Sequence, residues 1–126
     1  MQYIIATHGQ LAAGYENTVE MLTHFEKLHA ICAYGEENFP ENLVRLLDSF
    51  DEEEQILLFA DLLGGSVCQE AVSLMDAYPN LHVIAGMNLA LVLEVIISGL
   101  EPGKLDEAVE HARDQIVNIK KNQRLS

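Results

Sequence analysis

Tyr3-Ile4-Ile5-Ala6-Thr7-His8-Gly9, at the N-terminus of the chain, has the composition of a buried strand that runs into a histidine and a glycine. A second run, Ile56-Leu57-Leu58-Phe59-Ala60-Asp61-Leu62-Leu63-Gly64-Gly65-Ser66, ends in a carboxylate and a glycine-serine turn. The carboxyl ends of neighbouring parallel strands lie at the same edge of a sheet. If these two strands are neighbours, His8 meets Asp61.

Apolar runs of strand length recur along the chain, at residues 3–6, 28–33, 56–60 and 81–85. Longer stretches with helical periodicity separate them. Strands that alternate with helices favour a mostly parallel sheet with right-handed crossovers and helices on both faces. The sequence therefore predicts a doubly wound α/β fold of four strands, in the order 2-1-3-4, with the ligand site between strands one and three.

The predicted helices lie between these runs. The first carries an inward stripe of Leu11, Tyr15, Thr18, Val19 and Leu22. The second starts near Phe39 or Pro40, and the acidic residues 51–54 follow it as a solvated turn. The third starts at Ser66 and ends before Pro79, which cannot continue a helix. Its predicted inward face consists of Val67, Ala71, Leu74 and Met75.

The C-terminal segment is open to two interpretations. Its apolar residues from Leu105 to Ile119 are spaced as on an amphipathic helix, but residues 116–119 also have the composition of a strand at a sheet edge. The pattern alone does not decide between them.

The size and charge of the chain narrow the classes of function. Its 126 residues fit one domain, 1–126, with a core that needs neither disulfides nor metal. A net charge of -13 opposes binding to nucleic acid and to anionic membranes. We expect a cytoplasmic protein without direct membrane insertion, because no secretory signal or membrane span is found and Cys32 and Cys68 form no metal or redox motif.

The candidate site combines a nucleophile with an anion-binding turn. A carboxylate that accepts from one ring nitrogen of His8 leaves the lone pair of the other nitrogen free for attack. Gly64 and Gly65 allow close approach of backbone, and the free amides at the start of the next helix attract an anion. Ser66 is expected to cap that helix. Together these residues suit a phosphoryl group.

Other interpretations of these residues are weaker. No P-loop motif is found, so a nucleotide triphosphate is not expected, and no histidine has the spacing of a metal ligand. A serine hydrolase would use Ser66, His8 and Asp61, but the sequence after Ser66 lacks the trailing glycine of a nucleophile elbow. The remaining histidines, His24, His29, His82 and His111, are interpreted as surface residues.

The motifs Thr7-His8-Gly9 and Asp61-x-x-Gly64-Gly65-Ser66, with residues 83–89, resemble the enzyme IIA domain of the mannose family of the bacterial phosphoenolpyruvate-dependent sugar phosphotransferase system (PTS). The resemblance covers nearly the whole chain. It implies that His8 accepts a phosphoryl group from phosphorylated HPr on its far nitrogen and passes it to an enzyme IIB subunit, which serves the membrane IIC and IID components. It further implies that Asp61 holds the near nitrogen and that Gly64, Gly65 and Ser66 bind the phosphoryl oxygens.

The resemblance implies no metal, nucleotide or other cofactor. It implies a homodimer, in which residues 116–120 form a fifth, antiparallel strand exchanged between subunits and cover an open sheet edge. The chain departs from the family pattern at Leu63, Val67 and Gln69, where the family often has an aromatic residue, proline and asparagine. These departures bear on the choice of partner and on the geometry of the helix start.

Two alternatives share the fold. One is a regulatory binding module in which the phosphorylation state of His8 controls docking. The other is the related phosphotransfer subunit of dihydroxyacetone kinase, in which we would expect serine at the position of Gly9. The transported sugar cannot be inferred, because membrane components bind it.

Overall fold

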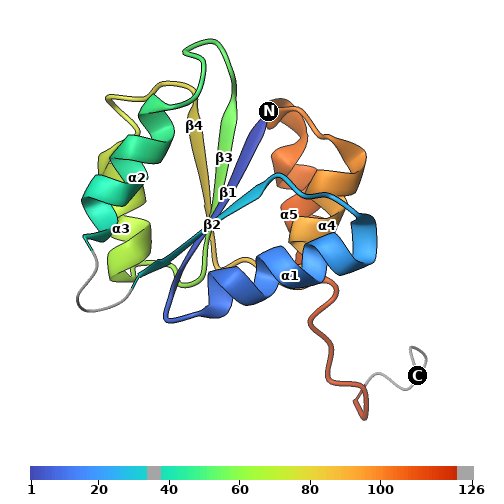
Figure 1. The fold of residues 1–126 in the computed structure, drawn as a ribbon. Helices are drawn as coiled ribbons and strands as arrows, with labels where there is room; N and C mark the ends of the chain where they lie inside the picture. The colour runs from blue at the N-terminus through green and yellow to red at the C-terminus, as the bar shows by residue number, and fades with distance from the viewer. Residues whose placement is uncertain (34–37, 122–126) are drawn as a thin grey trace. The chain divides into compact units, whose positions relative to one another are not determined.

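A computed structural model describes residues 1–33 and 38–121 (Figure 1). The chain divides into two compact units, of which the first spans Met1–Met87 and the second begins at Asn88. All of the predicted site residues belong to the first unit.

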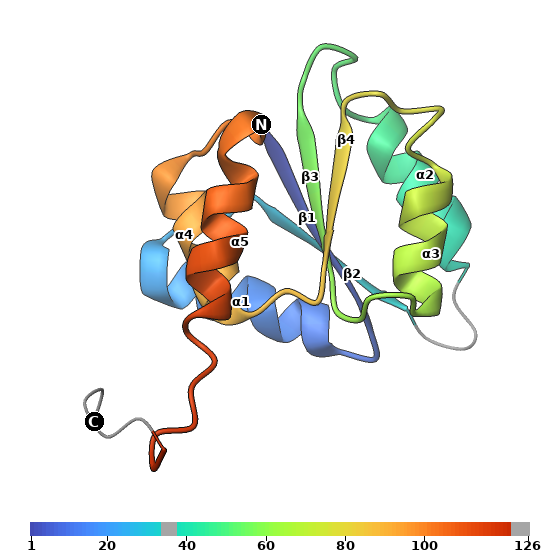
Figure 2. The same ribbon diagram turned by 180° about the vertical axis from the view of Figure 1, so that it is seen from behind.

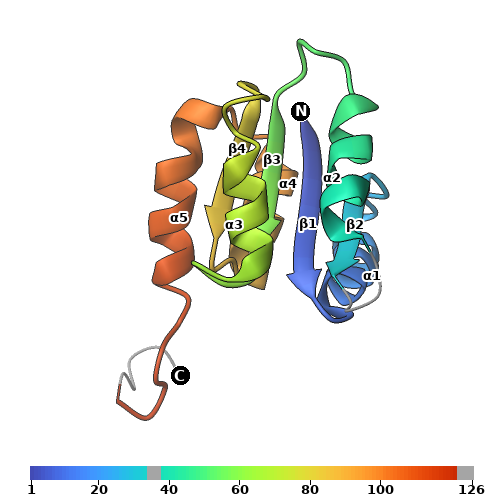
Figure 3. The same cartoon turned by 90° about the vertical axis from the view of Figure 1, so that its left-hand side faces the viewer.

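The first unit contains a four-stranded sheet, formed by β1 (Gln2–His8), β2 (Leu28–Ala33), β3 (Ile56–Ala60) and β4 (Leu81–Ala85). The strands lie in the order β2-β1-β3-β4 and every pair is parallel, as Figure 3 shows. The predicted order and the doubly wound α/β class are confirmed. Strand β1 is longer than predicted because its pairing with β2 continues to His8, which lies opposite Ala33.

Helices cover both faces of this sheet. Helix α1 (Leu11–Thr23) lies on one side, and α2 (Phe39–Asp48) and α3 (Ser66–Ser73) lie on the other (Figures 1 and 2). The side chains between the sheet and the α2–α3 pair form one buried cluster of Ile4, Ala6, Phe39, Leu43, Leu47, Ile56, Leu58, Ala60, Val67, Cys68, Ala71 and Leu81. Strands β1 and β3 are buried on both faces, as is typical of parallel strands that are covered by helices on each side.

The inward faces of two helices differ from the prediction. In α1, Leu11 and Leu22 are about half exposed, whereas Ala12 and Val19 are fully buried. Helix α3 ends at Ser73, and Met75, predicted to face inward, is exposed. The apolar periodicity identified both helices, but it placed the buried stripe of α1 one residue too early at its start.

The second unit consists of α4 (Leu89–Ser98), a short 3-10 helix η1 (Pro102–Lys104) and α5 (Leu105–Arg113). Asn88 joins two of them, because its Oδ1 accepts from the Leu91 N–H at 2.8 Å and its Nδ2 donates to the Ala112 carbonyl at 3.0 Å. No helix in the described part of the chain has the length and apolar character needed to cross a membrane.

The C-terminal segment follows neither interpretation within this chain. Helix α5 ends at Arg113, so a helix that continues to Ile119 is wrong. From Asp114 to Lys121 the described backbone forms turns and irregular structure without a strand. A strand that 116–120 would form with a second copy stays a prediction.

Candidate active site

The carboxyl ends of β1 and β3 bring together the two residues that the sequence singled out. Strand β1 ends at His8, and Asp61 directly follows β3, which pairs with β1 up to Ala6 and Ala60. The Nδ1 atom of His8 lies 2.9 Å from Oδ2 of Asp61, and the same oxygen accepts the backbone N–H of His8 at 2.9 Å. The expected contact is present, and it fixes both the backbone and the ring of His8.

This contact determines the tautomer of the neutral imidazole. A carboxylate can only accept hydrogen bonds, so Nδ1 carries the proton and Nε2 has the lone pair. The hydroxyl of Ser66 lies 3.2 Å from Nε2 and can donate to it. The His8 side chain is 45% exposed, whereas that of Asp61 is 10% exposed. The nucleophilic nitrogen therefore lies at an accessible rim, over a more buried carboxylate.

Several groups keep Asp61 ionised. Burial acts to raise the pKa of its carboxyl, but the hydrogen bonds from the N–H and ring of His8, together with their electrostatic attraction, outweigh burial and hold the pKa below its ordinary value of 3.8. The other oxygen, Oδ1, accepts the Leu62 N–H at 3.0 Å. A carboxylate that is charged at neutral pH can stabilise positive charge that develops on His8.

A tight turn connects Asp61 to α3. The Gly65 N–H donates to the Leu62 carbonyl at 3.2 Å, and Gly64 has φ of +78°, which residues with a Cβ rarely adopt. Gly65 is needed for space, because a Cβ there would lie 3.3 Å from Cε1 of His8. The Gln69 side chain donates to the Gly64 carbonyl at 3.0 Å. Both glycines thus have a steric or conformational role beside the imidazole.

The start of α3 has free amides. Its N-cap is Gly65, which offers no side-chain acceptor. The expectation that Ser66 caps the helix is wrong: Ser66 is the first helical residue, and its hydroxyl contacts His8 instead. By contrast, the side chains of Asn38 and Asn88 cap α2 and α4. Uncapped N–H groups at a helix start attract an anion. Ser66 is the first residue of α3 and contacts Nε2 of His8, so this helix start lies beside that nitrogen.

The turn between β1 and α1 is stabilised by Thr7, a residue of the Thr7-His8-Gly9 motif to which sequence analysis assigned no role of its own. Thr7 is fully buried, and its Oγ1 accepts the N–H of Ala12 at 2.7 Å, so it caps α1 from the preceding strand. Gly9 has φ of +57°, and its N–H donates to the Ala33 carbonyl at 3.2 Å. The sequence did not signal this role, because the hydrogen bond joins a strand residue to a helix that starts beyond the turn.

The other histidines form no second site. His24 and His111 are exposed, as predicted. His29 and His82 are partly buried rather than exposed. The His29 ring packs against Phe50 with 5.1 Å between centroids, and burial lowers its pKa. Within the described residues, no group of histidine, cysteine and carboxylate side chains could hold a metal ion.

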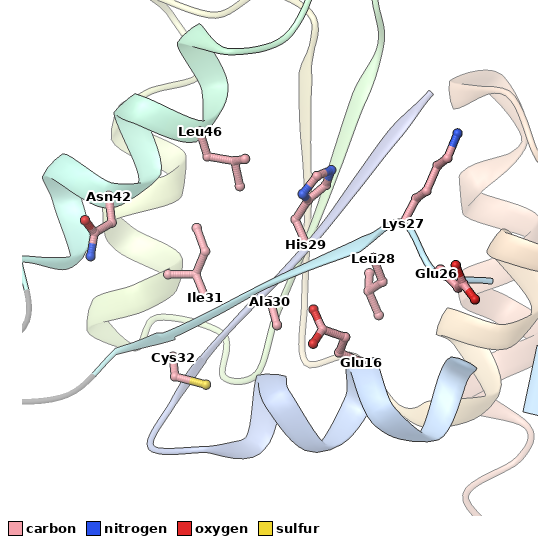
Figure 4. A pocket seen from close by; sticks show the side chains of 10 residues that line it. All are labelled: Glu16, Glu26, Lys27, Leu28, His29, Ala30, Ile31, Cys32, Asn42 and Leu46. Carbon is pink, nitrogen blue, oxygen red and sulfur yellow. The ribbon is translucent and has the colours of Figure 1, made fainter. Parts of the chain in front are cut away.

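A hollow of about 490 Å³ lies away from His8, along the edge strand β2 (Figure 4). Glu16 of α1 lines one side of it, and Asn42 and Leu46 of α2 line the other. The phosphoryl site predicted from the sequence is at the carboxyl ends of β1 and β3, and none of its residues lines this hollow.

Comparisons with known proteins agree with the motifs. Residues 2–113 match the model of a family described as PTS system fructose IIA component. The chain is 31% identical over 96 residues to the PTS system sorbose-specific EIIA component of Klebsiella pneumoniae. The aligned region covers 74% of this chain and 70% of the relative.

Two crystal structures are similar over nearly the whole chain. One is of a protein from Klebsiella pneumoniae assigned as a permease of the phosphoenolpyruvate-dependent sugar phosphotransferase system; its TM-score is 0.87 at 30% identity, covering 99% of this chain and 93% of that one. The other is the PTS IIA protein associated with the fucose utilization operon of Streptococcus pneumoniae; its TM-score is 0.84 at 25% identity, covering 99% and 96%.

Proposed function

The chain belongs to the family described as PTS system fructose IIA component, and on that basis we propose that it carries a phosphoryl group on Nε2 of His8. The resemblance to the mannose-family enzyme IIA domain is confirmed, and with it a general phosphotransfer role in a sugar phosphotransferase system. The observation that carries the specific proposal is the 2.9 Å contact between Nδ1 of His8 and Asp61, which leaves Nε2 as the free nucleophile.

The donor would be the phosphohistidine of the carrier HPr. The lone pair on Nε2 attacks phosphorus, the bond from phosphorus to the donor nitrogen breaks, and its electron pair returns to the donor imidazole. His8 gains positive charge in this step, and Asp61 stabilises that charge through Nδ1–H. Because phosphoryl transfer depends mainly on positioning and charge stabilisation, a fixed ring with an exposed nitrogen suits it.

The start of α3 offers hydrogen-bond donors to the phosphoryl oxygens. Before transfer the Ser66 hydroxyl donates to Nε2, and once phosphorus occupies that nitrogen the hydroxyl can turn to an oxygen of the phosphoryl group. The uncapped amides after Gly65 offer further donors to an anion. The site residues His8, Asp61, Gly64, Gly65 and Ser66 then form one phosphoryl-binding unit without metal or nucleotide.

In the second transfer His8 is the donor of the phosphoryl group. A histidine of an enzyme IIB subunit attacks phosphorus, and the bond to Nε2 breaks. The 45% exposure of His8 supports access by two protein partners in turn. We place this exchange in the cytoplasm, upstream of the membrane IIC and IID components. We also propose that the protein forms a homodimer, in which a second copy covers the exposed Ile116 and Ile119.

One rival function rests on a specific observation. Asp61, His8 and Ser66 are hydrogen bonded in the order of a hydrolase triad. A hydrolase would lose all activity with Ser66→Ala, and its Ser66 would react with a serine-directed fluorophosphonate. A phosphoryl carrier with Ser66→Ala still accepts the group on His8, at a reduced rate.

Intact-protein mass spectrometry under alkaline conditions separates these outcomes. Wild type, His8→Ala and Ser66→Ala are each incubated with phosphoenolpyruvate, enzyme I and HPr. The proposal expects one added phosphoryl group in wild type and Ser66→Ala and none in His8→Ala. Addition to His8→Ala would contradict it. Phosphorylation of wild type without onward transfer to any enzyme IIB would favour a regulatory module instead.

A further inference from the structure

The peptide group between Gly64 and Gly65 is fixed at both ends. Its carbonyl accepts from Nε2 of Gln69 at 3.0 Å, and its N–H donates to the Leu62 carbonyl at 3.2 Å. Two consecutive glycines are the most flexible backbone that a chain can have. The side chain of Gln69 therefore limits the backbone motion of the most flexible segment of the site.

This peptide lies directly beside the reacting atoms. Gly65 is so close to His8 that a Cβ would lie 3.3 Å from Cε1 of the imidazole. The next residue, Ser66, places its hydroxyl 3.2 Å from Nε2. A rotation of the Gly64–Gly65 peptide would therefore move the Ser66 hydroxyl relative to Nε2.

Gln69 also donates hydrogen bonds to two carbonyl oxygens that would repel an anion if they faced it. Its side chain binds the Gly64 oxygen, and its backbone N–H binds the Gly65 oxygen at 2.9 Å. A carbonyl that turned toward a phosphoryl group would oppose the donors that attract it. Because both oxygens are engaged by Gln69, the turn presents hydrogen-bond donors at the site.

From this geometry we propose that Gln69 is a positioning residue for phosphoryl transfer, acting through the Gly64–Gly65 peptide on Ser66 and the first amides of α3. The inference rests on the proposed function of His8. The Gln69 side chain is exposed and makes no contribution to the core. Its replacement is expected to slow transfer without unfolding the protein.

The test uses the full chain and phosphoramidate, a small phosphoryl donor. In that reaction the phosphorus–nitrogen bond of phosphoramidate breaks, ammonia leaves and a bond forms to Nε2, so no docking of a protein donor is involved. The variants are Gln69→Ala and Gln69→Glu. The matched control is Val72→Glu, which adds the same charge to an exposed position one turn further along α3.

At neutral pH both Gln69 variants should be phosphorylated about tenfold more slowly, since small displacements of reacting groups can cost up to about 100-fold. The pH profile separates positioning from a structural effect. The carboxyl introduced by Gln69→Glu can donate to the Gly64 carbonyl once it is protonated, and a glutamate ordinarily has a pKa of about 4.3, so the rate of this variant relative to wild type should rise as the pH falls from about 8 to about 4. The relative rate of Gln69→Ala should stay flat, and Val72→Glu should match wild type.

Two results would overturn the inference: a Gln69→Glu rate equal to wild type at neutral pH, or a slow rate that does not recover in acid while circular dichroism shows an intact fold. Failure of wild type itself to be phosphorylated on His8, by phosphoramidate and by HPr alike, would instead contradict the proposed function.

Discussion

One carboxylate oxygen of Asp61, Oδ2, accepts two hydrogen bonds of 2.9 Å from His8, one from the backbone N–H and one from Nδ1 of the ring. Strand pairing between β1 and β3 holds the two residues in register. The arrangement fixes where the imidazole lies, which nitrogen is protonated and which one is free to react.

Replacing Asp61 by asparagine should slow phosphorylation of His8 by about 100-fold, because the amide can donate to the ring and favour the wrong tautomer. The rate is measured with phosphorylated HPr by rapid quench and mass spectrometry. The exposed Asp76 provides a matched control, and Asp76→Asn should behave as wild type. Equal rates for Asp61→Asn and wild type would remove Asp61 from the mechanism.

Gly65→Ala and Gly14→Ala form a second matched pair. A Cβ at Gly65 would lie 3.3 Å from both Cε1 of His8 and Cβ of Leu62, so one of these neighbours must shift. No atom lies within 4 Å of a Cβ at Gly14, in helix α1. We expect Gly65→Ala to slow phosphorylation, and Gly14→Ala to keep the rate and gain about 0.5–1 kcal/mol of stability. The reverse order of rates would refute the packing argument.

Thr7 should contribute to stability through its hydroxyl. Thr7→Val leaves the Ala12 N–H without its acceptor and should lower the free energy of unfolding by about 1–3 kcal/mol. Thr7→Ser keeps the acceptor and loses only a methyl group, at a cost of about 1 kcal/mol. Urea denaturation measures both variants. A valine variant as stable as wild type would show that the hydrogen bond is not needed.

His111 should titrate above the ordinary histidine value of 6.5. The hydrogen bond and charge of Glu94, at 2.8 Å, raise its pKa, and desolvation acts in the opposite direction. Since the pKa is higher in the folded state, the stabilisation is fully present below pH 6.5 and is lost as pH rises through the raised value. NMR titration of the His111 ring should show this shift, and Glu94→Gln should abolish most of it.

The strands, the helices between them and the candidate residues at the strand ends could be predicted from local signals: apolar runs of strand length, helical periodicity between them, and polar residues where two runs end. The contact of His8 with Asp61 also required that β1 and β3 be neighbours, which the structure confirms. In a parallel sheet the carboxyl ends of neighbouring strands share an edge, so the strand order alone brings these two residues together.

Other features required the backbone itself. Thr7 caps α1 only because β1 turns sharply at Gly9, and Gln69 reaches Gly64 only because of the turn that precedes α3. The expectation that the Ser66 hydroxyl caps α3 was wrong, because helix capping and contact with His8 have the same sequence signal. At the C-terminus, helical periodicity continued past Arg113, although Ile116 and Ile119 are exposed in this chain.

The central claim is that Nε2 of His8 carries the phosphoryl group. It is tested most directly by NMR of protein with ring-15N-labelled histidine, phosphorylated by HPr, in which coupling to phosphorus identifies the modified nitrogen. The account predicts coupling to Nε2 of His8, with Nδ1 still protonated against Asp61. Phosphorylation at Nδ1, or at a residue other than His8, would contradict it.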